Sequence, residues 1–267
     1  RRHPELVGQG LRAYLDRWTE VSCELADALV TVSEFSRREI AELYGRPAEK
    51  ITVVPNAVDE AFFELPRPRT PSTLPYILSV GALEPKKNVL PLLRAFRELR
   101  RRNPLLPHRL VLAGGQGGAP WDVRKAAEAE PDLLERVAVL GHVPEDELRR
   151  LYAGADLFAY LSEYEGFGLP PLEAMAAGIP TIVSNRASLP EVTAGGALVV
   201  DPHDARGLGD VFEHALRDQV LRADLRDGGR AAARRFSWAA SAKKLAALYE
   251  SVVHGPPSLR VLAGGAA

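Results

Sequence analysis

A chain of 267 residues is long enough for one large α/β domain or for two smaller ones. Its 34 basic and 35 acidic side chains nearly cancel, so the charge gives no reason to expect a nucleic-acid-binding protein. Cys23 is the only cysteine, which excludes an internal disulfide bond and a cysteine-rich zinc site. We recognise no secretory signal and no apolar run of membrane-spanning length, and we expect a cytoplasmic protein.

Short, continuously apolar runs alternate with helical patterns along the chain. Such runs are typical of parallel strands that are buried on both faces. The predicted strands are 28–32, 51–54, 76–80, 110–113, 137–140, 156–161, 181–184 and 197–200. The predicted helices are 11–26, 34–43, 89–101, 121–134, 145–153, 170–177, 204–217 and a long stretch from 219 to 253. The alternation predicts a doubly wound parallel sheet, a Rossmann-like α/β fold.

The segment 65–75 is the best candidate for a linker, because four prolines fall within its eleven residues. Prolines without periodic apolar residues resist regular structure and stiffen a connection. We therefore predict that residues 66–235 form an open-sheet domain with six strands. Residues 1–65 hold too few strand–helix units for an independent core, and we interpret them as the C-terminal tail of another Rossmann-like domain. Residues 236–267 are predicted to form a final helix and a tail.

A glycine-containing loop follows the predicted strand 156–161. In open α/β sheets, ligands bind beyond the carboxyl ends of the strands. Gly166 and Gly168 let the backbone approach a ligand closely and adopt angles that other residues avoid. Pro170 predicts that a helix begins near it. Exposed N–H groups before a helix attract phosphate. A turn without any ligand is equally compatible with this fragment.

Two carboxylates flank the loop. Glu165 precedes the glycines, and Glu173 falls in the first turn of the predicted helix, seven residues further on. The helix macrodipole alone could explain Glu173. A carboxylate at that position can also accept hydrogen bonds from the two ribose hydroxyls of a nucleotide, as in dinucleotide-binding folds. Glu165 could then accept hydrogen bonds from sugar hydroxyls, and one loop would contact ribose, phosphate and sugar.

The segment EGFGLPPLEAMAAGIPTIVSN, residues 165–185, resembles the E-x7-E signature of the glycogen-synthase-like retaining glycosyltransferases, the mannosyltransferase-like group 1 enzymes with the two-domain GT-B fold. Further blocks occur in the order of that family: TVSEFSR at 31–37, VVPNAVD at 53–59, VGALEPKKN at 80–88, GHVPEDELRRLYAGAD at 141–156 and SLPEV at 188–192. The resemblance implies that residues 66–235 are the nucleotide-sugar donor domain. It also implies that the last helix crosses back towards the N-terminal, acceptor-side domain.

The resemblance assigns roles around the loop. It implies that Glu165 contacts the donor sugar and that Glu173 contacts the ribose. Backbone N–H groups of the donor loop would meet the phosphates or the sugar; these belong to Gly166, Phe167, Gly168 and Leu169.

Other blocks of the resemblance imply further contacts with the donor. Lys87 stands where the family has a basic residue against the diphosphate, and Lys86 is a weaker candidate for the same role. Gly81 follows the strand as in the family, but Ala82 stands where many members have arginine. His142 and Val143 occupy the position whose backbone meets the base. Ser33, Ser36 and Asn56 line the hinge or cleft, or act in turns and caps.

Retaining transfer expels a nucleoside diphosphate, whose developing charge needs stabilising where water is excluded. No Asp-x-Asp motif for a divalent cation occurs in the sequence, whereas Lys86, Lys87 and a helix N-terminus are present. We therefore expect metal-independent catalysis by Glu165 and Lys87, without a cofactor. Glu165 could act as a covalent nucleophile, as in retaining glycosidases. The resemblance instead implies front-face attack, assisted by a histidine that the N-terminal domain supplies; that domain is expected to lie largely upstream of Arg1.

The wording of the motifs most resembles bacterial enzymes that transfer mannose from GDP-mannose in polysaccharide assembly. A UDP-sugar donor and a nucleotide-sugar-binding module without catalysis remain alternatives. The EGFGLPPLE and SLPEV blocks favour a transferase over an epimerase or phosphorylase of the same architecture. The acceptor would be a glycan, a lipid-linked sugar or a small molecule. Basic residues around one helix predict either a solvated face or peripheral contact with anionic lipid at the inner face of the membrane: Lys86, Lys87, Arg94, Arg97 and Arg100–Arg102.

Overall fold

The computed structural model describes residues 9–66, 74–115, 133 and 135–254. The strands are β1 (Leu29–Thr31), β2 (Ile51–Val53), β3 (Tyr76–Val80), β4 (Arg109–Ala113), β5 (Val137–Gly141), β6 (Leu157–Tyr160), β7 (Thr181–Ser184) and β8 (Leu198–Val200). The α-helices are α1 (Gln9–Leu25), α2 (Glu34–Tyr44), α3 (Val89–Arg102), α6 (Glu145–Gly154), α7 (Leu169–Ala176), α8 (Leu189–Thr193), α9 (Ala205–Arg217), α10 (Gln219–Ala233) and α11 (Trp238–His254). Short 3₁₀ helices are η2 (Ala48–Lys50), η3 (Glu60–Glu64) and η4 (Pro85–Lys87).

The larger sheet has six parallel strands in the order β5-β4-β3-β6-β7-β8. Counted from β3, this is the 3-2-1-4-5-6 order of dinucleotide-binding folds. The strands β1 and β2 form a separate parallel pair. Each predicted strand is present with its ends within one residue of the prediction. The predicted doubly wound, parallel α/β fold is therefore confirmed.

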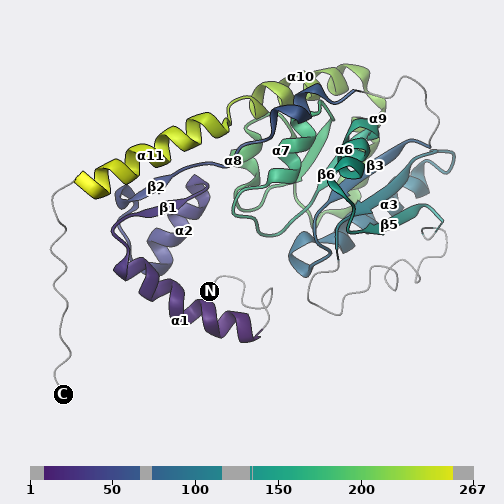
Figure 1. Cartoon of the computed structure of the whole chain (residues 1–267). Coiled ribbons are helices and arrows are strands. Elements are labelled where there is room, and N and C mark those ends of the chain that lie inside the picture. The colour runs from purple at the N-terminus through teal and green to yellow at the C-terminus, as the bar shows by residue number, and fades with distance from the viewer. Residues whose placement is uncertain (1–8, 67–73, 116–132, 134, 255–267) are drawn as a thin grey trace.

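Both faces of the six-stranded sheet are covered, as Figure 1 shows. Alternate residues of β6 enter different clusters: Phe158 and Tyr160 pack with α6, α7 and α10 residues, whereas Leu157 and Ala159 pack with α3 and α9. Complete burial of one large apolar side chain stabilises a fold by about 1.5–3 kcal/mol. The continuously apolar strands that predicted the sheet are thus explained by two cores, one on each face.

The helices differ from the prediction at three places. The stretch 219–253 forms two helices, α10 and α11, because the chain turns inward between them and the ring of Phe236 packs edge-on against Phe167, with 5.4 Å between centroids. The short helix α8 was not predicted, since its five residues are too few for a periodic pattern. The predicted helix 121–134 lies almost entirely outside the described residues.

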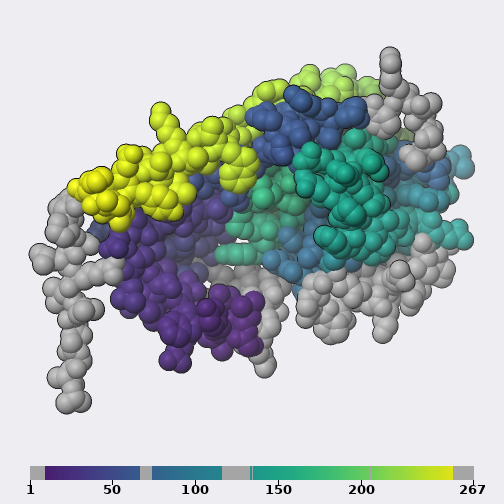
Figure 2. Space-filling model, viewed as in Figure 1, coloured from purple at the N-terminus to yellow at the C-terminus, as the bar shows by residue number. Residues whose placement is uncertain are grey.

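The N-terminal part comprises α1, β1, α2 and β2, and α11 extends from α10 to it (Figure 1). The Ser241 hydroxyl on α11 donates to the Pro55 carbonyl oxygen at 2.6 Å. Figure 2 shows α11, in yellow, lying against the purple atoms of this part. The domain boundaries at 65/66 and 235/236 stay predictions. Within the part of the chain that the structure describes, no helix is both long and apolar enough to cross a membrane.

Candidate functional site at the centre of the sheet

The strands β3 and β6 are neighbours at the centre of the sheet, where the strand order reverses. Open α/β sheets bind ligands at this switch point, beyond the carboxyl ends of the strands. The connection after β3 carries Lys86 and Lys87, and the connection after β6 carries Glu165. The Lys86 carbonyl oxygen accepts a hydrogen bond from Glu163 N at 2.7 Å, and the Ser162 hydroxyl oxygen lies 2.9 Å from it. These two contacts tie the connections together.

Three donors converge on one oxygen of Glu165. Its Oε1 accepts from Lys87 Nζ at 2.6 Å, from Ser162 Oγ at 2.6 Å and from the Tyr160 hydroxyl at 2.9 Å. The side chains of Lys87 and Glu165 are only 16% and 14% exposed, so solvent screens their ion pair weakly. Oε2 makes no hydrogen bond within the described residues. The carboxylate is thus held by one oxygen, and the other is available to a ligand.

Gly81 lies beside the lysine stem that reaches Glu165. Its φ of +149° is rare for other residues, and a Cβ there would lie 3.5 Å from Lys87 Cε and 3.7 Å from the Tyr160 ring. Lys86 takes another direction: its Nζ pairs with Glu84 Oε2 at 3.2 Å. The structure therefore brings Lys87, and not the ammonium group of Lys86, to Glu165.

The donor loop (residues 165–169) has its carbonyl groups bound and its N–H groups free. The Ser188 hydroxyl oxygen lies 2.9 Å from Glu165 O and 2.7 Å from Phe167 O. The Gly166 carbonyl oxygen accepts from Ser33 Oγ at 2.7 Å and from Ser36 Oγ at 3.2 Å. Within the described residues, no hydrogen bond is donated by the N–H groups at 166–169. Unpaired N–H groups at the start of a helix form a site for an anion.

The two loop glycines differ. Gly168 has a φ of +113°, and a Cβ there would lie 2.7 Å from Leu189 Cδ2, so no other residue fits without strain. Gly166 has no positive φ, and a Cβ would meet nothing closer than Ser36 Oγ at 3.7 Å. The expectation that both glycines adopt angles that other residues avoid is therefore correct for Gly168 and wrong for Gly166.

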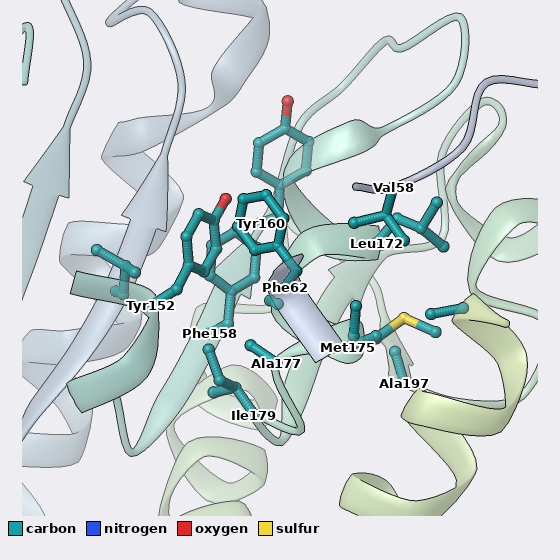
Figure 3. Packing of buried hydrophobic residues seen from close by; sticks show 14 of the residues in the cluster. Val58, Phe62, Tyr152, Phe158, Tyr160, Leu172, Met175, Ala177, Ile179 and Ala197 are labelled. Atoms are coloured by element: carbon teal, nitrogen blue, oxygen red, sulfur yellow. The ribbon is translucent and has the colours of Figure 1, made fainter. Parts of the chain in front are cut away.

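Glu173 lies in α7, one turn after the first residue of the helix, and is half-buried. The hydroxyl of Tyr152 donates to its Oε2 at 2.7 Å. Burial raises the pKa of Glu173, and the bond from Tyr152 opposes that rise. Tyr152 in turn stacks on Phe158, with 5.7 Å between centroids, and Figure 3 shows both rings with Tyr160 in the core beneath the site.

His142 and Val143 directly follow β5, the outer strand of the sheet. His142 is exposed, and Val143 is half-buried against the core cluster. Two strands, β4 and β3, separate β5 from β6, so these residues do not join the Glu165 group. The prediction that the backbone of residues 142–143, rather than a side chain, meets the base stays a prediction.

The basic residues around α3 are largely paired. Arg100 donates to the Leu106 carbonyl oxygen, Arg101 pairs with Glu98 at 3.1 Å, and Arg102 pairs with Asp210. Lys86 and Lys87 have the acidic partners described above. Most of these basic side chains therefore have a partner within the protein, and no lipid is needed to explain them.

Several residues of the site were not predicted. Tyr160 and Ser162 hold Glu165, and Ser188 holds the donor loop. Polar residues at the carboxyl end of a buried strand are a signal that could have identified Tyr160 and Ser162. Ser188 has no such signal, because only the tertiary fold brings the start of α8 to the donor loop.

The N-terminal part is attached to the same loop. Ser33 caps α2 by accepting from Ser36 N at 3.0 Å, and it also donates to Gly166 O. The proposed cap role and the proposed cleft role of Ser33 therefore coexist. In α8, Glu191 accepts from the backbone N–H groups of Glu34 and Phe35 at 2.7 and 2.9 Å. The start of α2 thus lies against both the donor loop and α8.

A parallel sheet with this strand order and helices on both faces defines the class of doubly wound, Rossmann-like α/β proteins. Within this class, the chain belongs to the glycosyl transferases group 1 family. The model of that family matches residues 62–232. The model of Glycosyltransferase Family 4 matches residues 2–62, in the N-terminal part.

The curated relatives include mannosyltransferases of Escherichia coli. The chain is 36% identical over 257 residues to O-antigen chain mannosyltransferase B, covering 88% of this chain and 63% of the relative. It is 31% identical over 256 residues to the serotype-specific mannosyltransferase WbdA, covering 86% of this chain and 29% of the relative. The chain thus spans less than two thirds of the length of either relative.

Solved structures share the fold. The crystal structure of Anabaena HepE in complex with UDP and glucose superimposes with a TM-score of 0.77 at 21% identity, over 93% of this chain and 69% of HepE. A glycosyltransferase from Rickettsia africae gives a TM-score of 0.76 at 20% identity, over 94% and 69%. Together with the parallel sheets, these similarities establish the GT-B architecture that the sequence predicted.

Proposed function

We propose that this chain carries the donor-binding half of a retaining, metal-independent hexosyltransferase. The enzyme moves mannose from GDP-mannose to a glycan, a lipid-linked sugar or a small-molecule acceptor. The observation that carries the proposal is the pairing of Lys87 with Glu165 beside a loop whose N–H groups at 166–169 have no partner among the described residues. Membership of the group 1 family and the mannosyltransferase relatives support the reaction and the sugar.

The geometry suggests how a donor binds. The diphosphate lies against the N–H groups at 166–169, with the ammonium group of Lys87 beside it. The free Oε2 of Glu165 accepts hydrogen bonds from the sugar hydroxyls. The carboxylate of Glu173, fixed by Tyr152, accepts hydrogen bonds from the ribose. Each of these groups is already fixed without the donor, so less entropy is lost when the donor binds.

Catalysis then depends on the leaving group. As the bond from the anomeric carbon to the diphosphate breaks, negative charge grows on the diphosphate oxygen. Lys87 and the N–H groups supply the positive charge that a divalent cation supplies in metal-dependent transferases. We expect front-face attack by the acceptor rather than a covalent glycosyl-enzyme, as the resemblance of the motifs to retaining transferases implies.

A UDP-sugar is the second candidate for the donor. HepE, which shares the fold, was crystallised with UDP and glucose. In this chain His142 is exposed, so the base would be recognised by backbone groups around it. A third candidate is a nucleotide-sugar-binding module without catalysis of its own, since the groups described above concern the donor alone.

A panel of nucleotide sugars tests the donor. We expect GDP-mannose to raise the melting temperature of the chain more than UDP-glucose does, because stabilisation grows with ligand concentration relative to Kd. Glu173→Ala should abolish the shift. The full-length protein should then transfer the sugar of the stabilising donor. A larger shift with a UDP-sugar would reverse the donor assignment, and binding without transfer would leave only the binding module.

A further inference from the structure

A buried tyrosine lies beneath the charged pair of the site. Tyr160 is the last residue of β6, and only 3% of its surface is exposed. Its ring stacks on that of Phe158 with 6.2 Å between centroids and 18° between planes. Phe158 stacks on Tyr152 on its other side, as Figure 3 shows. A central strand and a stack of rings therefore fix the position of the Tyr160 hydroxyl.

The hydroxyl joins the ammonium and the carboxylate groups. It accepts a hydrogen bond from Lys87 Nζ at 2.5 Å and donates to Glu165 Oε1 at 2.9 Å, while Nζ and Oε1 are 2.6 Å apart. Burial, and then the charge of Glu165, raise the pKa of Tyr160 well above its ordinary value, so the phenol stays protonated and keeps donating. The three groups thus form a closed triangle.

The triangle matters most for Lys87. A lysine ammonium group sits on a flexible four-carbon stem, whereas the tyrosine hydroxyl is held by a rigid ring. The ammonium group has three N–H donors, and two of them are used by Tyr160 and Glu165. The third N–H and Oε2 of Glu165 can therefore meet a ligand without breaking the triangle.

We propose that Tyr160 is a positioning residue for glycosyl transfer: its hydroxyl fixes the ammonium group of Lys87 relative to Glu165, where the leaving diphosphate develops charge. This inference rests on the proposed function. In the transfer, the bond between the anomeric carbon and the diphosphate oxygen breaks, and its electron pair stays on that oxygen. The acceptor hydroxyl oxygen forms the new bond, and its proton passes to the diphosphate. Tyr160 acts through Lys87 and forms no bond itself.

Because charge on the leaving oxygen grows as the bond breaks, a correctly placed ammonium group stabilises the transition state more than the bound donor. Tyr160→Phe keeps the ring and its stacking but removes the hydroxyl. We expect kcat to fall about tenfold, less than the loss on removing a direct donor to the developing charge, with the donor KM changed by no more than about twofold.

Tyr76→Phe is the matched control. Tyr76 lies on the neighbouring strand β3, and its hydroxyl donates to the Leu151 carbonyl oxygen at 2.7 Å, outside the site. This variant also loses a tyrosine hydroxyl that donates a hydrogen bond, and its kcat should equal that of the wild type. Equal losses of kcat in Tyr160→Phe and Tyr76→Phe would overturn the proposal.

A double-mutant cycle tests whether Tyr160 acts through Lys87. In the Lys87→Met background, Tyr160→Phe should lower kcat no further, because the group that the hydroxyl positions is gone. Losses that multiply independently would contradict this mechanism.

A second measurement does not need turnover. The ¹⁵N resonance of the Lys87 ammonium group in the ligand-free chain should broaden in Tyr160→Phe, through faster exchange with water, and stay sharp in Tyr76→Phe. An unchanged resonance in Tyr160→Phe would overturn the inference. If the wild type transfers no sugar from any donor but the resonance responds as expected, the proposed function fails and the positioning of Lys87 stands.

Discussion

At the scale of single residues, the donor loop depends on which backbone groups are already bound. The hydroxyl groups of Ser188 and Ser33 contact the carbonyl oxygens of residues 165–167. The N–H groups at 166–169 are left available to a ligand. This polarity of the loop requires the left-handed conformation of Gly168, which turns the chain into α7. The proposed anion site at this loop therefore depends on one glycine and two buried serines.

Gly168→Ala should destabilise the protein by about 3 kcal/mol, since a Cβ at positive φ costs about 1–2 kcal/mol and overpacking adds about 1–3 kcal/mol. The added Cβ would lie 2.7 Å from Leu189 Cδ2. The free energy of unfolding from urea titrations measures this loss. Gly166→Ala, in the same loop, is the control and should change stability by less than about 0.5 kcal/mol. Equal losses in the two variants would contradict the different roles of the glycines.

At the scale of elements, the contact between α8 and α2 joins the N-terminal part to the part that carries the six-stranded sheet. Both oxygens of Glu191 accept from the first N–H groups of α2, those of Glu34 and Phe35. A carboxylate at a helix N-terminus satisfies orphan donors and interacts favourably with the macrodipole. Since Ser33 at the same helix start bonds to Gly166, the start of α2 is also attached to the donor loop.

Glu191→Gln should weaken this contact by about 1 kcal/mol, because an amide loses the charge and offers one acceptor oxygen instead of two. Amide hydrogen exchange measures the effect: the N–H groups of Glu34 and Phe35 should lose protection. The Ser36 N–H, which donates to Ser33 Oγ at 3.0 Å, is an internal control and should stay protected. Equal loss of protection at all three amides would mean that α2 unfolds as a whole.

At the scale of the whole molecule, buried titratable groups at the two ends of the sheet give stability opposite pH dependences. Burial lowers the pKa of His108, which lies 3.7 Å from Asp156 at the end of the sheet away from the site. The unfolded state binds a proton more readily, so stability is lost as the pH falls below 6.5. Burial raises the pKa of Glu173, so the folded state binds the proton more readily and stability is lost as the pH rises above about 4.5.

The difference in unfolding free energy between pH 7 and pH 4 should therefore change in opposite directions in two variants. Glu173→Gln removes a term that lowers stability at pH 7, so the difference should become more positive than in the wild type. His108→Gln removes a term that lowers stability at pH 4, so the difference should become less positive. Denaturant titrations at both pH values measure this, and shifts of the same sign would contradict the assignment.

The sequence by itself determined the fold class and the family. The continuous apolar runs predicted every strand of the six-stranded sheet, because parallel strands are buried on both faces. The motif from Glu165 to Glu173 indicated the donor loop, and the family is confirmed. The roles of Lys87, Glu165 and Glu173 towards a donor stay predictions. These features are local in sequence, since periodicity and motif spacing extend over a few residues.

Only the tertiary structure decided which groups hold the site. Tyr160 meets Lys87 across 73 positions of sequence, and Glu191 meets Glu34 across 157. No periodicity or spacing encodes such pairs. They form only when the crossover connections bring the residues after β3, the end of β6 and α8 together beyond the carboxyl ends of the strands. The same folding bound the carbonyl groups of the donor loop and left its N–H groups free. The motif therefore indicated where a donor would bind, and long-range packing decided how its carboxylate and ammonium groups are oriented.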